Sequence, residues 1–246
     1  MVARAGAALA VIVAVGLFGT APAARAEVAV PERLQNVDRS TLSFTYEPGV
    51  FEPQYTPPAP GTYELPVITS IDDHPLIGSA GDATTLFALT GEHLAVVAFI
   101  YTSCVEAVGC PVSHAVLHGL DRALAADPAL AKRVRLVTVS FDPDRDTPAQ
   151  MASQRTLHEP RTDWRFATTA GGAELQSLLD DFDQPVAKLR YEDGKWTGLF
   201  RHVLKVFLLD GRHRVRAIYS TGFLNQALVL NDLKTLAADG GGSAAK

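Results

Sequence analysis

The only two cysteines of the chain, Cys104 and Cys110, lie where a strand is expected to give way to a helix. The apolar run Val96–Tyr101 predicts a buried strand, and Pro111 opens a helical pattern directly after the second cysteine. A helix N-terminus carries unpaired N–H groups and a partial positive charge, which favour a thiolate over a thiol. Two such thiols could exchange disulfides, bind a soft metal ion or form a structural disulfide.

The short loop between the cysteines argues against a purely structural disulfide. Only five residues separate Cys104 from Cys110, and cross-linking so short a loop contributes little stability. Exported proteins, the class to which the N-terminal residues described next point, nevertheless often pair their cysteines as disulfides. The structural disulfide is therefore the least favoured of the three interpretations.

The N-terminal residues 1–26 have the features of a secretory signal peptide. Arg4 precedes an uncharged run over residues 5–24, and Ala24-Arg25-Ala26 forms a small-x-small cleavage pattern. The alternative is an uncleaved membrane anchor, because about 20 uncharged residues can span a bilayer. We predict export to the periplasm, with membrane anchoring through this segment as the alternative.

Three further segments are expected after residues 1–26. Residues 27–66 are rich in proline and form an arm or linker, because proline excludes helix and central strands. Residues 67–238 form one folded domain, and residues 239–246 form a glycine-rich disordered tail. The net charge of −5 argues against a nucleic-acid partner, which would require a basic face.

Strand and helix patterns alternate through residues 67–238, which predicts an α/β domain with a mixed central sheet. The predicted strands span residues 84–89, 96–101, 135–141, 203–209 and 214–219, with a short extended piece at Phe166. The predicted helices span residues 111–126, 147–157, 173–182 and 226–237. The thiols then lie at the end of the central strand.

Three motifs follow one another along the chain: FIYTSC with CPVSHAVL, then VTVSFDPDRDTP, then HVLKVFLLD. In type and order they resemble the Sco (SenC/PrrC-type) family of copper-binding proteins, over roughly residues 65–236. The resemblance implies a thioredoxin-like three-layer fold with a central mixed sheet. It also implies a role in assembling the dinuclear copper centre of cytochrome c oxidase. The partner would be the copper-site subunit of that oxidase or another periplasmic copper or thiol protein.

The resemblance also implies the site residues. The family's two cysteines and one histidine correspond to Cys104, Cys110 and His202, and Asp142 would lie near them as a supporting carboxylate. The family motif is C-x-x-x-C-P, whereas this chain has two more residues between its cysteines. We expect Gly109 to accommodate the extra length by adopting a positive φ.

The predicted donor set favours copper. Thiolates are soft ligands that select Cu(I) or zinc, and imidazole suits both metals. Three protein ligands leave one position open for transfer, whereas a structural zinc site would use four. We therefore predict bound copper, with zinc less favoured.

His114 and His118 follow Cys110 on one face of the predicted helix. We expect a solvated helix face, and a zinc or second copper site is the alternative. His114 could also lie near Cys110 and lower the pKa of its thiol. We assign no function to His158.

The leading hypothesis is an exported metallochaperone rather than an enzyme. It would deliver copper to a respiratory copper centre or reduce the cysteines of that centre. The second hypothesis is a periplasmic thiol–disulfide oxidoreductase without stable metal, in which Cys104 attacks and Cys110 resolves. The third is an interaction domain whose cysteines form a structural disulfide.

Overall fold

Strand β4 (Leu94–Ile100) lies at the centre of the fold, and all seven of its residues are buried. The computed structural model describes residues 53, 55–104 and 110–240. Alternate residues of β4 belong to two different apolar clusters, Leu94, Val96 and Ala98 to one and Ala95, Val97 and Phe99 to the other. A strand covered on both faces needs a continuous apolar run, which explains the lack of polar alternation in its sequence.

The main sheet has eight strands in the order β1-β10-β9-β4-β5-β6-β2-β3. Strands β4, β5 and β6 are parallel, whereas β9 and β10 on one side and β2 and β3 on the other pair antiparallel. The predicted mixed sheet is therefore confirmed. The remaining strands are β1 (Thr69–Ser70), β2 (Pro75–Gly78), β3 (Ala83–Thr85), β5 (Val134–Ser140), β6 (Trp164–Thr168), β9 (Lys205–Leu209) and β10 (Arg214–Ser220).

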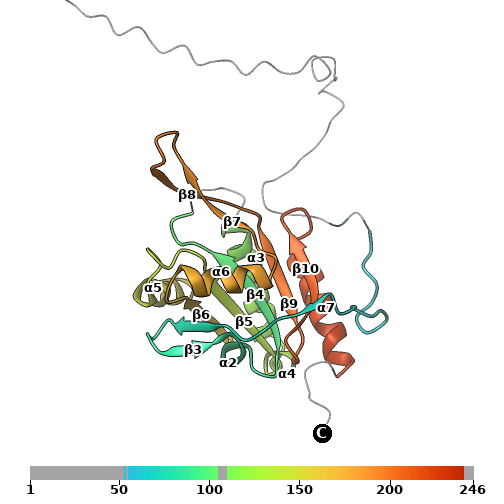
Figure 1. The fold of residues 1–246 in the computed structure, drawn as a ribbon. Coiled ribbons are helices and arrows are strands. Elements are labelled where there is room, and N and C mark those ends of the chain that lie inside the picture. Colours follow the sequence, from blue (N-terminus) through green and yellow to red (C-terminus); the bar gives the residue numbers. More distant parts are fainter. Residues whose placement is uncertain (1–52, 54, 105–109, 241–246) are drawn as a thin grey trace, which may run out of the picture. The chain divides into compact units, whose positions relative to one another are not determined.

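Helices cover both faces of this sheet, which gives three layers (Figure 1). The first apolar cluster includes residues of α3 (Cys110–Ala125), α4 (Pro128–Ala131), α5 (Pro148–His158) and α7 (Gln226–Ala238). The second includes residues of α2 (Leu86–Thr90) and α6 (Gly172–Asp181). The layered arrangement agrees with the prediction from the alternating patterns.

The predicted helices are confirmed to within one or two residues at their ends, and capping residues explain where they begin. Thr147 caps α5 by accepting the N–H of Gln150, and Pro148 is the first helical residue. The strand predicted over residues 84–89 is largely wrong. Strand β3 ends at Thr85, whose hydroxyl accepts the N–H of Ala88 and starts α2 instead.

The sequence reading missed a β-hairpin formed by β7 (Val186–Arg190) and β8 (Trp196–His202). It forms a separate two-stranded sheet that extends beyond the large one (Figure 1). Four of the five residues of β7 are exposed, so the strand has no apolar alternation to reveal it. The hairpin matters because His202 is its last residue.

The described part of the proline-rich arm packs against the domain. The hydroxyl of Tyr63 donates to the carboxylate of Asp232 on α7, and the Gly61 N–H donates to the Thr235 hydroxyl at 3.1 Å. The predicted signal peptide and residues 241–246 of the predicted tail lie outside the described residues. Within residues 53–240, as far as described, no helix is long and apolar enough to cross a membrane.

Candidate functional site

The two cysteines flank the junction between β4 and α3. Cys104 is partly buried and follows the strand, and Cys110 is buried as the first residue of α3. Both pack into the apolar cluster that includes Tyr101 and Phe141. The intervening residues 105–109 lie outside the described residues, so the expected conformation of Gly109 stays a prediction.

The helix after Cys110 provides an electrostatic reason for a reactive thiol. Helix α3 has 16 residues and no acidic residue in its first turn. No acidic residue of this turn offsets the partial positive charge at the helix N-terminus, and that charge stabilises a thiolate at this end.

A buried carboxylate holds the turn that leads to Cys104. The carboxylate of Asp146 accepts the N–H of Thr102 at 2.9 Å, the hydroxyl of Thr102, and the hydroxyl of Ser140 at 2.5 Å. Its side chain is completely buried. Asp146 thus connects the thiol-bearing turn to the end of β5.

The end of β8 brings His202 to the same turn. Its ring lies 5.7 Å from the ring of Tyr101 and 5.1 Å from the ring of Phe141, between ring centroids. Within the described part of the chain, the buried Nδ1 of His202 has no hydrogen-bond partner. A cleft of about 620 Å³ lies beside it, lined by residues that include Gln184 and Val203.

The structure brings His202 to the aromatic residues around the cysteines but does not display a formed metal site. Among residues 53–240, as far as described, no three histidine, cysteine, aspartate or glutamate side chains are grouped so that they could hold a metal ion. The assignment of Cys104, Cys110 and His202 as ligands therefore stays a prediction.

Asp142 lies beside the same aromatic residues. It is buried and pairs with Arg145, whose guanidinium lies 4.3 Å from the ring of Trp196 and 5.9 Å from that of Tyr101. Burial raises the pKa of Asp142, and the hydrogen bond from Arg145 opposes the shift. Its Oδ1 is buried with no hydrogen-bond partner in the described part of the chain. Asp142 is therefore part of a packed polar group rather than of a solvated loop.

His114 and His118 do not lie on a solvated helix face, so that prediction is wrong. The ring of His114 lies 4.4 Å from the ring of His158, and Nε2 of His118 lies 2.6 Å from Nδ1 of His158. Burial, and to a lesser extent the neighbouring His158 and His118, lower the pKa of His114 to about 4. His114 is therefore neutral at pH 7 and adds no positive charge near Cys110.

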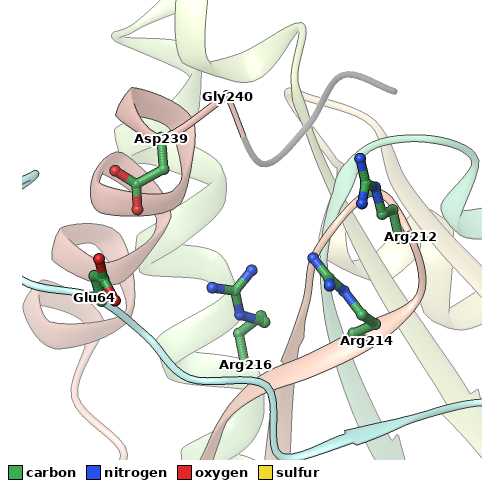
Figure 2. A pocket seen from close by; sticks show the side chains of 7 residues that line it. Glu64, Arg212, Arg214, Arg216, Asp239 and Gly240 are labelled. Atoms are coloured by element: carbon green, nitrogen blue, oxygen red, sulfur yellow. The ribbon is translucent and has the colours of Figure 1, made fainter. Parts of the chain in front are cut away.

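A second polar pocket, of about 360 Å³, has a structural explanation. Figure 2 shows Arg212, Arg214 and Arg216 facing Glu64 and Asp239 across it. The buried Asp210 accepts hydrogen bonds from Arg214 and Arg216, at 2.9 Å each. Burial alone would raise the pKa of Asp210, but these bonds hold it below its ordinary value. Arg216 also donates to the backbone oxygen of Leu65 and so attaches the arm to β10.

Comparison with known families decides what kind of protein this is. The family model described as SCO1/SenC matches residues 69–238, which include both cysteines, Asp142 and His202. The chain belongs to the SCO1/SenC family. The predicted resemblance is thereby confirmed, and the fold of this SCO1/SenC protein is thioredoxin-like.

Solved structures agree with this assignment. Copper-bound ScoI from Bradyrhizobium japonicum is 24% identical, with a TM-score of 0.54, and the match covers 67% of this chain and 98% of that one. Copper-bound ScoI from Arabidopsis thaliana is 20% identical, with a TM-score of 0.57 and coverage of 68% and 98%. BsSco, described as a member of the Sco family of cytochrome c oxidase assembly proteins with a disulfide switch, is 20% identical, with a TM-score of 0.53 and coverage of 72% and 98%. No curated protein matches the chain.

Sequence reasoning did not find the residues that surround the candidate site. Tyr101 and Phe141 were visible only as apolar strand residues. Asp146 was visible only as one charge in a turn. Their roles depend on contacts between segments far apart in the chain, which local patterns do not report.

Proposed function

We propose that this SCO1/SenC protein is an exported copper carrier. It binds one copper ion through Cys104, Cys110 and His202. It delivers that ion to a respiratory copper centre such as that of cytochrome c oxidase, or reduces the cysteines of that centre.

The observation that carries this proposal is the contact between His202 and Tyr101. Tyr101 precedes Cys104 by three residues, and Asp146 fixes the turn between them through Thr102. The imidazole that the proposal needs therefore lies against the segment that bears the first thiol. Its buried Nδ1 without a hydrogen-bond partner, within the described residues, marks a polar group that a ligand or a proton acceptor would satisfy.

The donor chemistry suits a cargo metal. Two thiolates and one imidazole form a soft set that selects Cu(I). Three protein ligands leave a position for a ligand of the receiving protein. Asp142 is a supporting carboxylate in this proposal, because it pairs with Arg145 beside the same aromatic rings.

Two further observations support the proposal. Copper is bound in the two ScoI structures to which this chain is similar, and BsSco is described as belonging to a family of oxidase assembly proteins. Residues 1–26 have the form of a signal peptide, which suits delivery to a centre outside the cytoplasm.

Copper titration under anaerobic, reducing conditions tests the proposal. The wild-type protein is expected to take one Cu(I) per chain from a competing chelator. Cys104→Ser, Cys110→Ser and His202→Ala are each expected to lose stoichiometric binding, whereas His93→Ala retains it. Absence of binding by the wild-type protein overturns the carrier, and unchanged binding by His202→Ala overturns the ligand assignment.

One observation favours a second function, thiol–disulfide exchange. Cys104 is partly exposed whereas Cys110 is buried, as expected for an attacking and a resolving thiol. The reduction potential of the Cys104–Cys110 pair distinguishes a structural disulfide from a pair that exchanges. A potential below about −300 mV indicates a structural disulfide, and a less negative value indicates a pair that exchanges.

A further inference from the structure

Trp196 is the first residue of β8, and the proposed copper ligand His202 is the last. Among the described strands, β7 and β8 pair only with each other. A two-stranded hairpin by itself is at best marginally stable in water, so side-chain contacts with the main domain must hold this one in place. These contacts therefore decide where His202 lies.

The strongest contact of Trp196 outside the hairpin is with Arg145. The guanidinium carbon of Arg145 lies over the indole ring, 4.3 Å from its centroid. A cation at this distance is attracted by the ring, and tryptophan is the best aromatic partner for it. Arg145 is itself fixed, because its Nε donates to the buried carboxylate of Asp142 and its backbone N–H donates to the Asp142 oxygen at 3.1 Å. Trp196 thus attaches the start of β8 to the turn after β5.

Ring contacts lead from Trp196 to His202. The ring of Trp196 meets that of Phe200 edge-on, with 5.3 Å between centroids. Phe200 is buried and lies 5.1 Å from Tyr101 and 5.3 Å from Phe141. The same two rings contact His202, which is two residues after Phe200 and so faces the same side of β8. A displacement of Trp196 would therefore reach His202 through Phe200.

A second cation lies near the indole ring but contributes less. Nζ of Lys188 on β7 lies 4.7 Å from the ring centroid of Trp196 and 2.7 Å from the Asp144 carboxylate. The side chains of Lys188 and Asp144 are 37% and 67% exposed, and ion pairs so open to water add little stability. The contact with Arg145 is therefore the main attachment.

The indole N–H of Trp196 donates to the backbone oxygen of Leu199 at 2.9 Å, which fixes the orientation of the ring within the hairpin. Phenylalanine at this position would lose that bond but keep an aromatic ring for Arg145. Leucine would lose both. The two substitutions therefore separate the ring contact from the hydrogen bond.

We propose that Trp196 is a positioning residue for the copper site. Held by Arg145, it fixes the β7–β8 hairpin so that the imidazole of His202 lies against Tyr101 and Phe141 before the metal binds. This inference rests on the proposed function, in which His202 is a copper ligand. A ligand that is already in place loses little freedom on binding, so its preorganisation tightens the hold on the metal.

The first test requires no metal. NMR spectra of the imidazole C–H groups are recorded for the metal-free full chain, and the His202 signals are those absent from His202→Ala. Nearby aromatic rings shift these signals, so the signals report whether His202 lies against Tyr101 and Phe141. Trp196→Leu is expected to move them toward the values of an unstructured histidine, whereas Trp196→Phe is expected to keep them close to those of the wild type.

Trp164→Phe is the matched control, because Trp164 is buried in the other apolar cluster, away from the hairpin. It is expected to lower the melting temperature and to leave the His202 signals unchanged. Circular dichroism checks that each variant folds, and Trp196→Met replaces Trp196→Leu if the latter does not. Unchanged His202 signals in the folded Trp196 variant overturn the proposal.

Chelator competition for Cu(I) supplies the second readout. Trp196→Leu is expected to raise the Kd for Cu(I) about three- to tenfold, whereas Trp196→Phe and Trp164→Phe keep the wild-type value. His202 signals that move while the Kd stays constant also overturn the proposal. A wild-type protein that binds no Cu(I) overturns the copper carrier instead, and the NMR comparison still decides whether Trp196 fixes His202.

Discussion

The imidazole ring of His202 meets the ring of Tyr101 edge-on, with 5.7 Å between the ring centroids. Tyr101 follows β4 and His202 ends β8, so this contact joins the two segments that carry the proposed copper ligands. Phe141, at the end of β5, lies 5.2 Å from Tyr101 and 5.1 Å from His202. The rings of Tyr101 and Phe141 therefore restrict where the imidazole of His202 can lie.

Replacing Phe141 by a smaller side chain should weaken copper binding. Phe141→Leu is expected to lower the free energy of unfolding by about 1–2 kcal/mol through lost packing. It should also raise the Kd for Cu(I) roughly tenfold, because His202 loses one of its contacts. Chemical denaturation and chelator competition measure the two effects.

Phe182→Leu is the matched control for that variant. Phe182 is buried in the same apolar cluster and packs against Phe99 and Phe207. We expect a similar loss of stability and an unchanged Kd for copper. If both variants bind copper equally well, the ring of Phe141 does not position His202.

Removing the carboxylate of Asp146 should free the turn that leads to Cys104. Asp146→Ala deletes the acceptor of the Thr102 N–H and of two hydroxyls, at an expected cost of about 2–4 kcal/mol. Cys104 should then react faster with a thiol-modifying reagent. Asp144→Ala is the control from the same turn, because Asp144 is exposed and pairs only with Lys188 in the described structure. An unchanged thiol reaction rate in Asp146→Ala would contradict this role.

The raised pKa of Asp142 predicts a pH dependence with a definite sign. The folded state binds this proton more tightly than the unfolded state, whose pKa is about 3.9. Stability gained from the proton is present at low pH and is lost as the pH rises through the raised pKa. The unfolding free energy of the wild type minus that of Asp142→Asn should therefore fall from about pH 4 upward and then become constant.

Asp163→Asn provides the opposite case. Burial alone would raise the pKa of Asp163, but Arg165 and Arg135 hold it below its ordinary value. The unfolding free energy of the wild type minus that of Asp163→Asn should therefore fall as the pH decreases through the lowered pKa. Denaturation curves at a series of pH values measure both differences in unfolding free energy. A difference for Asp142→Asn that rises with pH would show that the ion pair with Arg145 outweighs burial.

The arm should detach when its link to β10 is removed. Arg216→Met deletes the bonds to Leu65 and Asp210, so we expect a loss of about 1–3 kcal/mol and faster proteolysis within residues 55–66. Copper stoichiometry should not change. Arg212→Met is the control, because the side chain of Arg212 is exposed. Equal proteolysis of the two variants would exclude Arg216 as the attachment.

Local features of the sequence determined much of this protein. The apolar run before Cys104 predicts the central strand, the Thr147-Pro148 pair predicts the start of a helix, and the order of three motifs predicts the family. These features are read correctly because strand burial and helix capping depend on neighbouring residues. The thiols at a strand–helix junction follow from them directly.

The tertiary structure alone decided which polar and aromatic side chains meet. The hairpin that carries His202 could not be predicted, because the residues of its first strand, β7, are mostly exposed and do not alternate. Nothing in the local sequence distinguishes the buried Asp146 from the exposed Asp144. His114 could be taken for a surface residue until the end of α5 placed His158 against it. Such contacts join residues far apart in the chain, and their energies come from shared burial, so no pattern within one segment encodes them.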